Sequence, residues 1–370
     1  MSAELTASDR SVTSRESAGI RRLLIMRLGS MGDILHTLPA ASALRAALPQ
    51  AHIGWVVEER WAELLCAASE PRSGPRSPRR PLVDNLHVVD TKAWRKNPVS
   101  IGTVEQIATA LSELRGQRYD VAIDFQGAVR SALLARLSRA PVIYGFRQPR
   151  ENVATMFYTR QVIAEGRHVA EQNLSLAKAV LGRSPDVPGI EFPCDPAADK
   201  QCQRWLESQS VRDFVLLNPG AGWGAKQWPA ERYGRLAECL AETGLTPLVN
   251  GGPGEEELAQ AAKAASGGTA QTVAGSLAEL LALTRRATLF VGGDTGPMHL
   301  AAALGIPVVA IFGPTSPERN GPYLTPSIVL RSPSSETSYA RLPKPDAGLL
   351  EIGVGDVLAA AQTLLGQSRG

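Results

Sequence analysis

The sequence predicts an α/β protein made of two doubly wound domains, each a parallel sheet with helices on both faces. Two observations support this prediction. Near-continuous apolar runs of strand length alternate with helix-length segments along the chain, as expected for parallel strands that are covered on both faces. At 370 residues the chain is also too long for one ordinary core, so two domains are expected.

The first series of elements runs from residue 21 to residue 185. The predicted strands are "RRLLIMRL" (21–28), "HIGWVVEE" (52–59), "NLHVVD" (85–90), "YDVAIDFQG" (119–127) and "PVIYGF" (141–146). The predicted helices are "AASALRAALP" (40–49), with a helical pattern already starting at Ile34, "IATALSELRGQ" (107–117), "SALLARLS" (131–138) and 170–182. The Pro/Arg/Ser-rich segment 71–83 and the basic "TKAWRKNP" (91–98) are predicted to be loops.

A stretch rich in Pro, Gly and Asp, "GRSPDVPGIEFPCDPAADK", follows, and the domain linker is placed at 186–195 within it. The second domain is predicted over 196–350, with strands at 213–220, 246–252, 287–294 and 307–313 and helices at 229–243, 254–265, 276–286 and 295–304. A C-terminal helix is assigned to 351–370. Ligands of such sheets bind beyond the carboxyl ends of the strands, which is where the glycine-rich turns fall.

Composition is that of a globular protein, with 44% hydrophobic and 20% charged residues. The longest apolar run, 300–312, is interrupted by Gly305 and Pro307 and is too short to span a bilayer. Residues 1–20 lack the apolar region of a signal peptide and are expected to form a disordered tail. The four cysteines lie far apart without a CxxC motif, so unpaired thiols and a cytoplasmic location are expected.

The net charge of +3 is unevenly distributed, because residues 1–185 carry +8 and the remainder carries −5. A basic half can meet nucleic acid, a membrane surface or an anionic small molecule. No zinc-finger spacing and no aromatic RNA-binding strand is present. Nucleic acid is therefore not expected as a partner, and the other two classes stay open.

The stretch "FVGGDTGPMHLAAALGIPVVAIFGPTSPERNGPY" is the first that points to chemistry. A strand ends in two glycines, Asp294-Thr295-Gly296 opens a helix, and His299 lies one turn further on. The Thr295 hydroxyl and the unpaired N–H groups of a helix start can hold a diphosphate. The alternative is structural: Asp294 caps the helix and His299 is a satisfied buried residue.

A second glycine-rich loop, "NPGAGWGAKQWPAERYGRL", carries Lys226 after a predicted strand. A lysine there supplies a point positive charge for a phosphate leaving group. The spacing is not that of a Walker loop, and a solvated loop lysine is the alternative.

The turn "MRLGSMGDILHTLPA" poses a different problem. It looks like a phosphate-binding strand–turn–helix, but Asp33 would repel a phosphate. Its structural alternative is a helix N-cap.

Taken in order, "GSMGDILHTLPAASALR", "NPGAGWGAKQWPAERY" and "GGDTGPMHLAAALGIPVVAIFGPTSPER" resemble the bacterial heptosyltransferases of glycosyltransferase family 9 over roughly residues 21–365. "WRK" (94–96), "DFQG" (124–127) and "FYTRQV…RHVAEQN" (157–173) are most similar to the members that add the first heptose to Kdo2-lipid A. The resemblance implies a GT-B fold, the donor ADP-L-glycero-β-D-manno-heptose, the acceptor Kdo2-lipid A, inversion at the anomeric carbon, and no metal or other cofactor. It places the acceptor on 21–185 and the donor on 196–350.

The resemblance also implies roles for individual residues. Asp33 matches the general base that deprotonates the Kdo hydroxyl, a role compatible with a helix start because the helix dipole favours a carboxylate there. Lys226 matches the lysine that steadies the diphosphate. The implied donor-site residues are Met31, Gly32, Ala221, Gly222, Lys226, Asp294, Thr295, Gly296 and His299, and the implied acceptor-site residues are Arg95, Lys96, Arg147 and His168. Some family members carry paired threonines on the loop before the lysine, where Ala221, Gly222 and Trp223 stand here, so the diphosphate contacts of that loop are expected from backbone N–H groups.

Several alternatives stay open at this point. The chain also resembles heptosyltransferases that act on an already heptosylated core, and another ADP-sugar remains an option as donor. A sugar-nucleotide epimerase would need a second acidic cluster beside Asp294, and a dehydrogenase would have to use Glu58-Glu59 at the end of the second strand. The segment 71–83 is a candidate for peripheral contact with the inner leaflet of the inner membrane.

Overall fold

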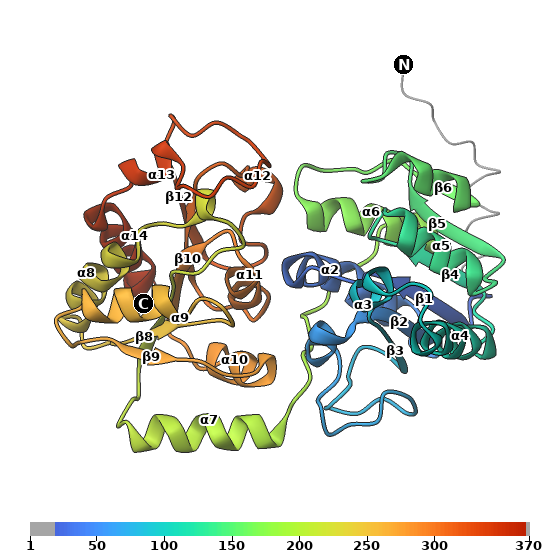
Figure 1. The fold of residues 1–370 in the computed structure, drawn as a ribbon, viewed down its shortest axis with the longest axis horizontal. Coiled ribbons are helices and arrows are strands. Elements are labelled where there is room, and N and C mark those ends of the chain that lie inside the picture. Colours follow the sequence, from blue (N-terminus) through green and yellow to red (C-terminus); the bar gives the residue numbers. More distant parts are fainter. Residues whose placement is uncertain (1–18, 368–370) are drawn as a thin grey trace. The chain divides into compact units, whose positions relative to one another are not determined.

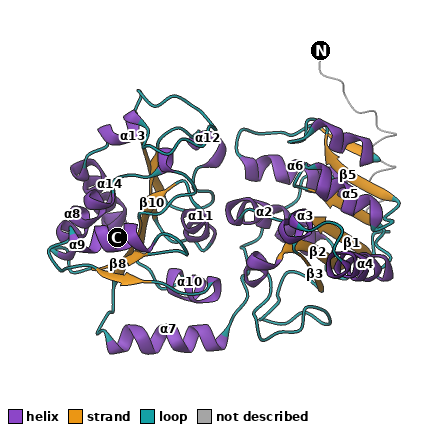
Figure 2. Ribbon diagram, in the orientation of Figure 1, coloured by secondary structure: helices purple, strands orange, loops and turns teal. Residues whose placement is uncertain are grey.

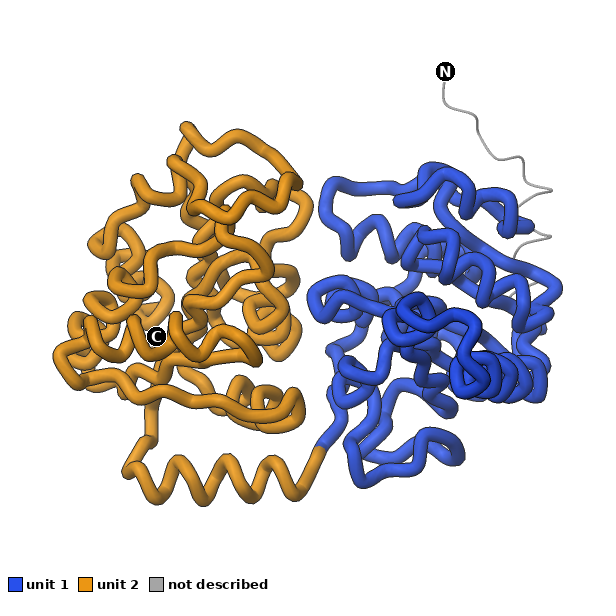
Figure 3. Tube along the Cα trace, in the orientation of Figure 1, with its two compact units in different colours: residues 1–194 blue, residues 195–370 orange. Residues whose placement is uncertain are grey.

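The computed structural model describes residues 19–367, which form two compact units that divide between Cys194 and Asp195 (Figure 3). Most of the predicted tail, residues 1–18, lies outside the described residues, as do residues 368–370 of the predicted C-terminal helix. The boundary between the units falls at the end of the predicted linker 186–195. Each unit contains one six-stranded parallel sheet with helices packed on it (Figures 1 and 2).

The sheet of the first unit has the order β3-β2-β1-β4-β5-β6. Its strands are β1 (Arg22–Met26), β2 (His52–Glu58), β3 (Asn85–Val89), β4 (Val121–Asp124), β5 (Val142–Phe146) and β6 (Arg160–Val162). Its helices are α2 (Met31–Ala47), α3 (Thr91–Lys96), α4 (Ile101–Gly116), α5 (Val129–Leu137) and α6 (Val169–Leu181), with 3-10 turns η1 (Glu59–Leu64) and η2 (Asn152–Phe157). Helix α5 packs on the face that presents Leu24, Met26 and Ala122, and α2 packs against α6.

The second unit repeats this plan with the strand order β12-β11-β10-β7-β8-β9. Its strands are β7 (Phe214–Asn218), β8 (Thr246–Asn250), β9 (Gln271–Val273), β10 (Leu289–Gly293), β11 (Val308–Phe312) and β12 (Ser327–Arg331). Its helices are α7 (Pro196–Ser208), α8 (Ala230–Ala241), α9 (Glu256–Ala264), α10 (Leu277–Thr284), α11 (Gly296–Ala303), α12 (Pro317–Asn320), α13 (Ala347–Glu351) and α14 (Val354–Gln367), with the 3-10 turn η3 (Gly224–Lys226).

Successive apolar side chains along the central strands of this second sheet point to opposite faces, which explains why helices cover both faces. Along β7, Phe214 and Leu216 point to the layer of α7, α10 and α11, whereas Val215 and Leu217 point to the layer of α8, α9 and α14. Because both layers are apolar, the strand reads as an unbroken apolar run. The predicted doubly wound architecture is confirmed in both units.

One predicted helix in the first unit is close to the observed one, and one predicted loop is wrong. Helix α2 begins at Met31, three residues before the predicted start of the helical pattern at Ile34, and continues through Pro39 to Ala47. The segment predicted as the loop 91–98 contains α3, because the Asp90 carboxylate accepts a hydrogen bond from the Ala93 N–H (2.8 Å) and starts a helix there.

Segment 71–83 is exposed only over its first part. Arg80 has 1% of its surface exposed, and Leu82 and Val83 are also buried. The Arg80 guanidinium donates to the carbonyls of Pro71, Gly74, Pro75 and Val83. Segment 71–83 is therefore folded around a buried arginine, which does not fit a loop that lies freely on a membrane.

Candidate functional site

In the second unit, polar side chains gather beyond the carboxyl ends of β7 and β10. Lys226 ends the turn η3 after β7, and Asp294 directly follows β10. The Lys226 ammonium donates to the Asp294 carboxylate (2.5 Å) and to the Asp294 carbonyl (3.2 Å). An ammonium has three donors, so one donor of Lys226 remains for a ligand.

Asp294 also meets His299, one turn into α11. The His299 Nε2 atom lies 3.1 Å from an Asp294 carboxylate oxygen, and the Asp294 side chain is 6% exposed. Burial by itself would raise the pKa of Asp294, but the hydrogen bond and charge of His299 and the charge of Lys226 outweigh it and hold the pKa well below its usual range. Asp294 is therefore a buried carboxylate that fixes a cation, and the predicted alternative of a helix cap is wrong, because the N-cap of α11 is Thr295.

The start of α11 has hydrogen-bond donors that are available to a ligand of the second unit. Thr295 has extended backbone angles, its hydroxyl donates weakly to the Gly293 carbonyl (3.3 Å), and Gly296 is the first helical residue. The first N–H groups of a helix have no partner within the helix. Thr295 and Gly296 are partly exposed, so an anion can approach them.

The loop after β7 places the aromatic ring of Trp223 beside two cations. The Lys226 ammonium lies 4.2 Å from the centre of the Trp223 ring, and the Arg341 guanidinium lies 5.5 Å from it. Ala221 is partly exposed, and at Gly222 an added Cβ would meet open space. The backbone of this loop is therefore accessible next to two cations.

A carboxylate that was missed follows β8, the strand beside β7. An added Cβ at Gly220 would lie 2.0 Å from the Glu255 carboxyl group, so Glu255 reaches the same glycine-rich loop. Burial, with Glu256 nearby, raises the pKa of Glu255 despite its hydrogen bond to Gly252. An acidic residue after the second strand of a mononucleotide-binding fold commonly accepts hydrogen bonds from ribose hydroxyls, and this positional rule could have identified it.

In the first unit, Asp33 lies in the first turn of α2 rather than in front of it. Its Oδ2 atom accepts hydrogen bonds from the Ser30 N–H (2.9 Å) and the Ser30 hydroxyl (3.1 Å). Ser30 is the N-cap, and Asp33 completes one half of a capping box. The side chain remains 39% exposed, whereas Met31 is buried and Gly32 is partly buried beside it.

A buried cation, Arg27, supports Asp33 and was absent from the predicted site. Its Nη2 lies 3.4 Å from Asp33 Oδ1, its Nε donates to the Asp33 carbonyl (3.1 Å), and its Nη1 donates to the Phe125 carbonyl (2.6 Å). Arg27 was hidden because it stands between two apolar residues at the end of a strand. Gln126 fixes the same turn, since its side-chain oxygen accepts from the N–H groups of Leu28 and Gly29.

Gln126 is in turn held by Asp124, which is completely buried. The Asp124 carboxylate accepts hydrogen bonds from the Gln126 and Gly127 N–H groups and from the hydroxyls of Ser131 and Tyr158. Burial raises the pKa of Asp124 to about 6, although these four hydrogen bonds oppose the shift. The "DFQG" stretch thus supports the Asp33 turn from the neighbouring strand.

The predicted acceptor-site cations lie at the same edge of this sheet. Arg95 and Lys96 end α3, which follows β3, and Arg147 follows β5; all three are exposed. Strands β3 and β5 each lie two positions from β1, which places the strand ends about 10 Å on either side of the end of β1. Cations therefore flank the Asp33 turn on both sides.

His168 occupies a structural position. It is 8% exposed, its Nδ1 atom accepts from the Ala170 N–H (3.1 Å) at the start of α6, and its ring packs edge-on against His36 on α2 at 5.2 Å. Contact between His168 and an acceptor stays a prediction.

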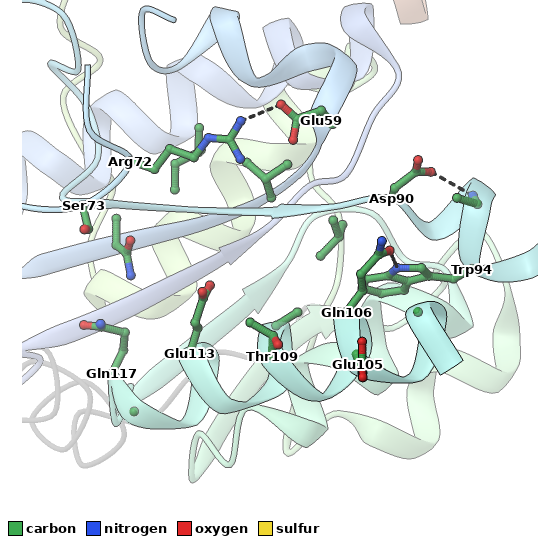
Figure 4. Close-up of a pocket in the computed structure, with 18 residues that line it drawn as sticks. Glu59, Arg72, Ser73, Asp90, Trp94, Glu105, Gln106, Thr109, Glu113 and Gln117 are labelled. Atoms are coloured by element: carbon green, nitrogen blue, oxygen red, sulfur yellow. Dashed lines mark hydrogen bonds and ion pairs between the residues drawn. The ribbon is translucent and has the colours of Figure 1, made fainter. Parts of the chain in front are cut away.

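A pocket of about 1040 Å³ lies elsewhere in the first unit, between β3, α3 and α4 (Figure 4). Trp94 lies at its wall, and the Trp94 indole N–H donates to Gln106 (3.1 Å). Carboxylates of Glu59, Asp90, Glu105 and Glu113 also line it, whereas Asp33, Arg95 and Lys96 do not. This pocket is therefore separate from the Asp33 turn.

Three further features concern thiols, metal ligands and helix length. Cys66, Cys194, Cys202 and Cys239 are all free thiols, as predicted. Within residues 19–367, no cluster of three or more His, Cys, Asp or Glu side chains is arranged to hold a metal ion. Among the described helices, none combines the length and the apolar character needed to cross a bilayer.

Two α/β units, each with a parallel sheet and polar groups at its carboxyl edge, are typical of proteins that bind a nucleotide or another small ligand at that edge. Residues 107–345 match glycosyltransferase family 9 (heptosyltransferase). Lipopolysaccharide heptosyltransferase 1 of Pseudomonas aeruginosa is 32% identical over 82% of this chain and 81% of its own length. The Escherichia coli K12 protein of the same name is 31% identical over 84% of this chain and 94% of its own length.

A solved structure agrees with these sequence relatives. The E. coli heptosyltransferase WaaC with ADP superposes with a TM-score of 0.75 at 28% identity, covering 93% of this chain and 99% of that one. The chain belongs to glycosyltransferase family 9, the heptosyltransferases, and is a glycosyltransferase. The epimerase and dehydrogenase alternatives are not favoured.

Proposed function

We propose that the chain transfers L-glycero-D-manno-heptose from ADP-heptose to the Kdo sugar of Kdo2-lipid A, as a step of lipopolysaccharide inner-core assembly. The observation that carries the proposal is the Lys226–Asp294 pair at the start of α11, in a chain 31–32% identical to proteins named lipopolysaccharide heptosyltransferase 1. The reaction takes place at the cytoplasmic face of the inner membrane, where a lipid-linked acceptor meets a water-soluble donor.

The second unit binds the donor in this proposal. Because Pro297, the second residue of α11, has no N–H, the Gly296 N–H and the Thr295 hydroxyl bind the diphosphate. The remaining donor of Lys226 contacts a phosphate oxygen. Backbone N–H groups near Ala221 and Gly222 add contacts, and Glu255 accepts hydrogen bonds from the ribose. Asp294 keeps the Lys226 ammonium in place, so that the positive charge is already oriented when the leaving group becomes negative.

The first unit binds the acceptor and supplies the base. Asp33 takes the proton of the attacking Kdo hydroxyl, and the hydroxyl oxygen forms a bond to the anomeric carbon of heptose. The bond from that carbon to the phosphate oxygen breaks, and ADP leaves with the electron pair, so attack from the opposite face inverts the configuration. Lys226 and the α11 start neutralise the departing charge, and we propose that no metal is required. Arg95, Lys96 and Arg147 bind the carboxylates and phosphates of the acceptor.

The test compares heptose transfer from ADP-heptose to Kdo2-lipid A by the wild type, Asp33→Asn and Ser30→Ala. We expect transfer by the wild type, a loss of about a hundredfold or more in Asp33→Asn, and a much smaller loss in Ser30→Ala, which lacks a cap but keeps the base. ADP should raise the melting temperature of all three, and UDP and NAD should not. Firm ADP binding without transfer by the wild type would contradict this acceptor and point to an already heptosylated core or another ADP-sugar.

A further inference from the structure

The segment from Thr91 to Val104 exposes large apolar side chains close together. Val99, Ile101 and Val104 are 90%, 79% and 54% exposed. Val99 directly precedes Ser100, the N-cap of α4, and Ile101 and Val104 are three residues apart on its first turn, so they share one face of the helix. Single exposed apolar residues are common, but a contiguous group marks an interaction surface.

The group has no role in the core of the first unit. Helix α4 buries only Thr103 and Leu114 among its sixteen residues. Between α4 and β3 lies the pocket of about 1040 Å³, so the helix stands away from the sheet over part of its length (Figure 4). Ser100 already starts the helix by accepting from the Thr103 N–H (3.2 Å). Apolar side chains on the outer first turn are therefore unexplained by folding.

Cations accompany the apolar group. Residues 91–104 contain Lys92, Arg95 and Lys96, all exposed, and no Asp or Glu. The nearest acidic residues along the chain, Asp90 and Glu105, flank the segment, and the Asp90 carboxylate is occupied by the start of α3. Exposed apolar side chains beside lysine and arginine are typical of surfaces that bind anionic lipid.

The segment is tied to the edge of the sheet that carries Asp33. The Thr91 hydroxyl donates to the Glu58 carboxylate at the end of β2 and accepts from Arg130 on α5 (3.2 Å). Helix α3 therefore lies beyond the carboxyl ends of the strands, near the β3 edge of the sheet rather than the β6 edge. A membrane that contacts this segment would lie next to the acceptor edge.

We propose that residues 91–104 form a membrane-docking surface, in which Val99, Ile101 and Val104 enter the headgroup region of a bilayer and Lys92 contacts anionic phospholipid, next to Arg95 and Lys96, which bind the anionic groups of the lipid-linked acceptor. This deepens the proposed function, on which it rests, because an acceptor with acyl chains remains in the bilayer and must be reached there. The surface holds the acceptor edge of the first unit at the membrane and replaces segment 71–83 as the candidate contact.

The test is binding to vesicles of phosphatidylethanolamine and phosphatidylglycerol, measured by flotation. We expect the variant Val99→Ser/Ile101→Ser/Val104→Ser to bind at least about tenfold more weakly than the wild type. The matched control is Met156→Ser/Ile163→Ser, whose side chains are 81% and 65% exposed at the opposite, β6, end of the same sheet, and it should bind like the wild type. Vesicles of phosphatidylcholine alone should bind the wild type several-fold more weakly.

Equal vesicle binding by the wild type and the triple variant, or an equal loss in the control, would overturn the proposal. So would a wild type that is dimeric in sedimentation velocity and a triple variant that is monomeric, because the surface would then be a protein interface. An unchanged melting temperature is expected for the triple variant, since these side chains are exposed. If the wild type binds vesicles through this surface but transfers no heptose to Kdo2-lipid A, the proposed function fails and the docking surface stands.

Discussion

The buried pair Lys226–Asp294 offers the sharpest test of how the candidate site of the second unit is held together. The two side chains are 11% and 6% exposed and 2.5 Å apart. Removing one partner of a buried pair leaves an uncompensated charge and typically costs about 3–5 kcal/mol. Lys226→Met leaves Asp294 with His299, and Asp294→Asn leaves Lys226 with the Trp223 ring, a contact of about 1 kcal/mol. We therefore expect each single variant to lose about 3 kcal/mol, at the low end of that range.

The double variant should lose much less than the sum of the two single losses, because it leaves neither charge unpaired. A coupling free energy of about 2–3 kcal/mol is expected from a cycle measured by urea unfolding. Lys344→Met, at an exposed lysine of the same unit, serves as control and should change stability by less than about 0.5 kcal/mol. Single losses that add within about 0.5 kcal/mol would refute the assignment of Asp294 as the partner that fixes Lys226.

Three further predictions concern the first unit. Burial raises the pKa of Asp124 from 3.8 to about 6, so between these pH values the folded state binds a proton that the unfolded chain does not. The resulting contribution to the free energy of unfolding is full below pH 3.8 and falls by about 3 kcal/mol as pH rises through 6. Asp124→Asn should abolish this slope in urea unfolding measured across the same pH range. Burial lowers the pKa of His87 from 6.5 to about 4, so the free energy of unfolding decreases by about 3 kcal/mol as pH falls from 6.5 to 4. His87→Gln should remove that decrease, and a variant with the same loss of stability at acid pH as the wild type would contradict this explanation. Gly54→Ala should lower the melting temperature through a loss of about 1–3 kcal/mol, because its Cβ would lie 1.9 Å from the Tyr119 hydroxyl, whereas Gly102→Ala enters open space and should not destabilise.

The sequence predicted the strands that are largely buried, including the edge strand β3, and missed the three edge strands that are not. Strand β7 is buried at all five positions, and such an apolar run can be recognised from the sequence. Strands β6, β9 and β12 contain no buried position, and each lies at an edge of its sheet. Their pairing depends on a neighbour far away in sequence, which composition and periodicity do not report.

Among the candidate site residues too, those in local sequence motifs were predicted, and those that act through contacts distant in sequence were missed. Lys226, Asp294 and Asp33 stand in glycine-rich turns after apolar runs, so strand–turn–helix logic found them. Arg27 and Glu255 were missed because each acts across the fold: Arg27 reaches the Phe125 carbonyl on a neighbouring strand, and Glu255 reaches the loop at Gly220. A charged residue inside an apolar strand, such as Arg27, was nevertheless a usable signal, since burial of an arginine requires partners.

The hydrogen bonds of Asp33 leave room for the role of base that we propose for it, although the same carboxylate helps to start α2. A carboxylate has about four acceptor positions. Ser30 uses two positions on Oδ2, and Arg27 approaches Oδ1 from the buried side at 3.4 Å. With 39% of the side chain exposed, one position on Oδ1 is left for a hydroxyl of the acceptor. Asn at this position keeps an acceptor oxygen for Ser30 but leaves the buried Arg27 without its counter-charge. A transfer defect in Asp33→Asn therefore reports the lost base only if the variant keeps the melting temperature of the wild type, which shows that α2 remains folded.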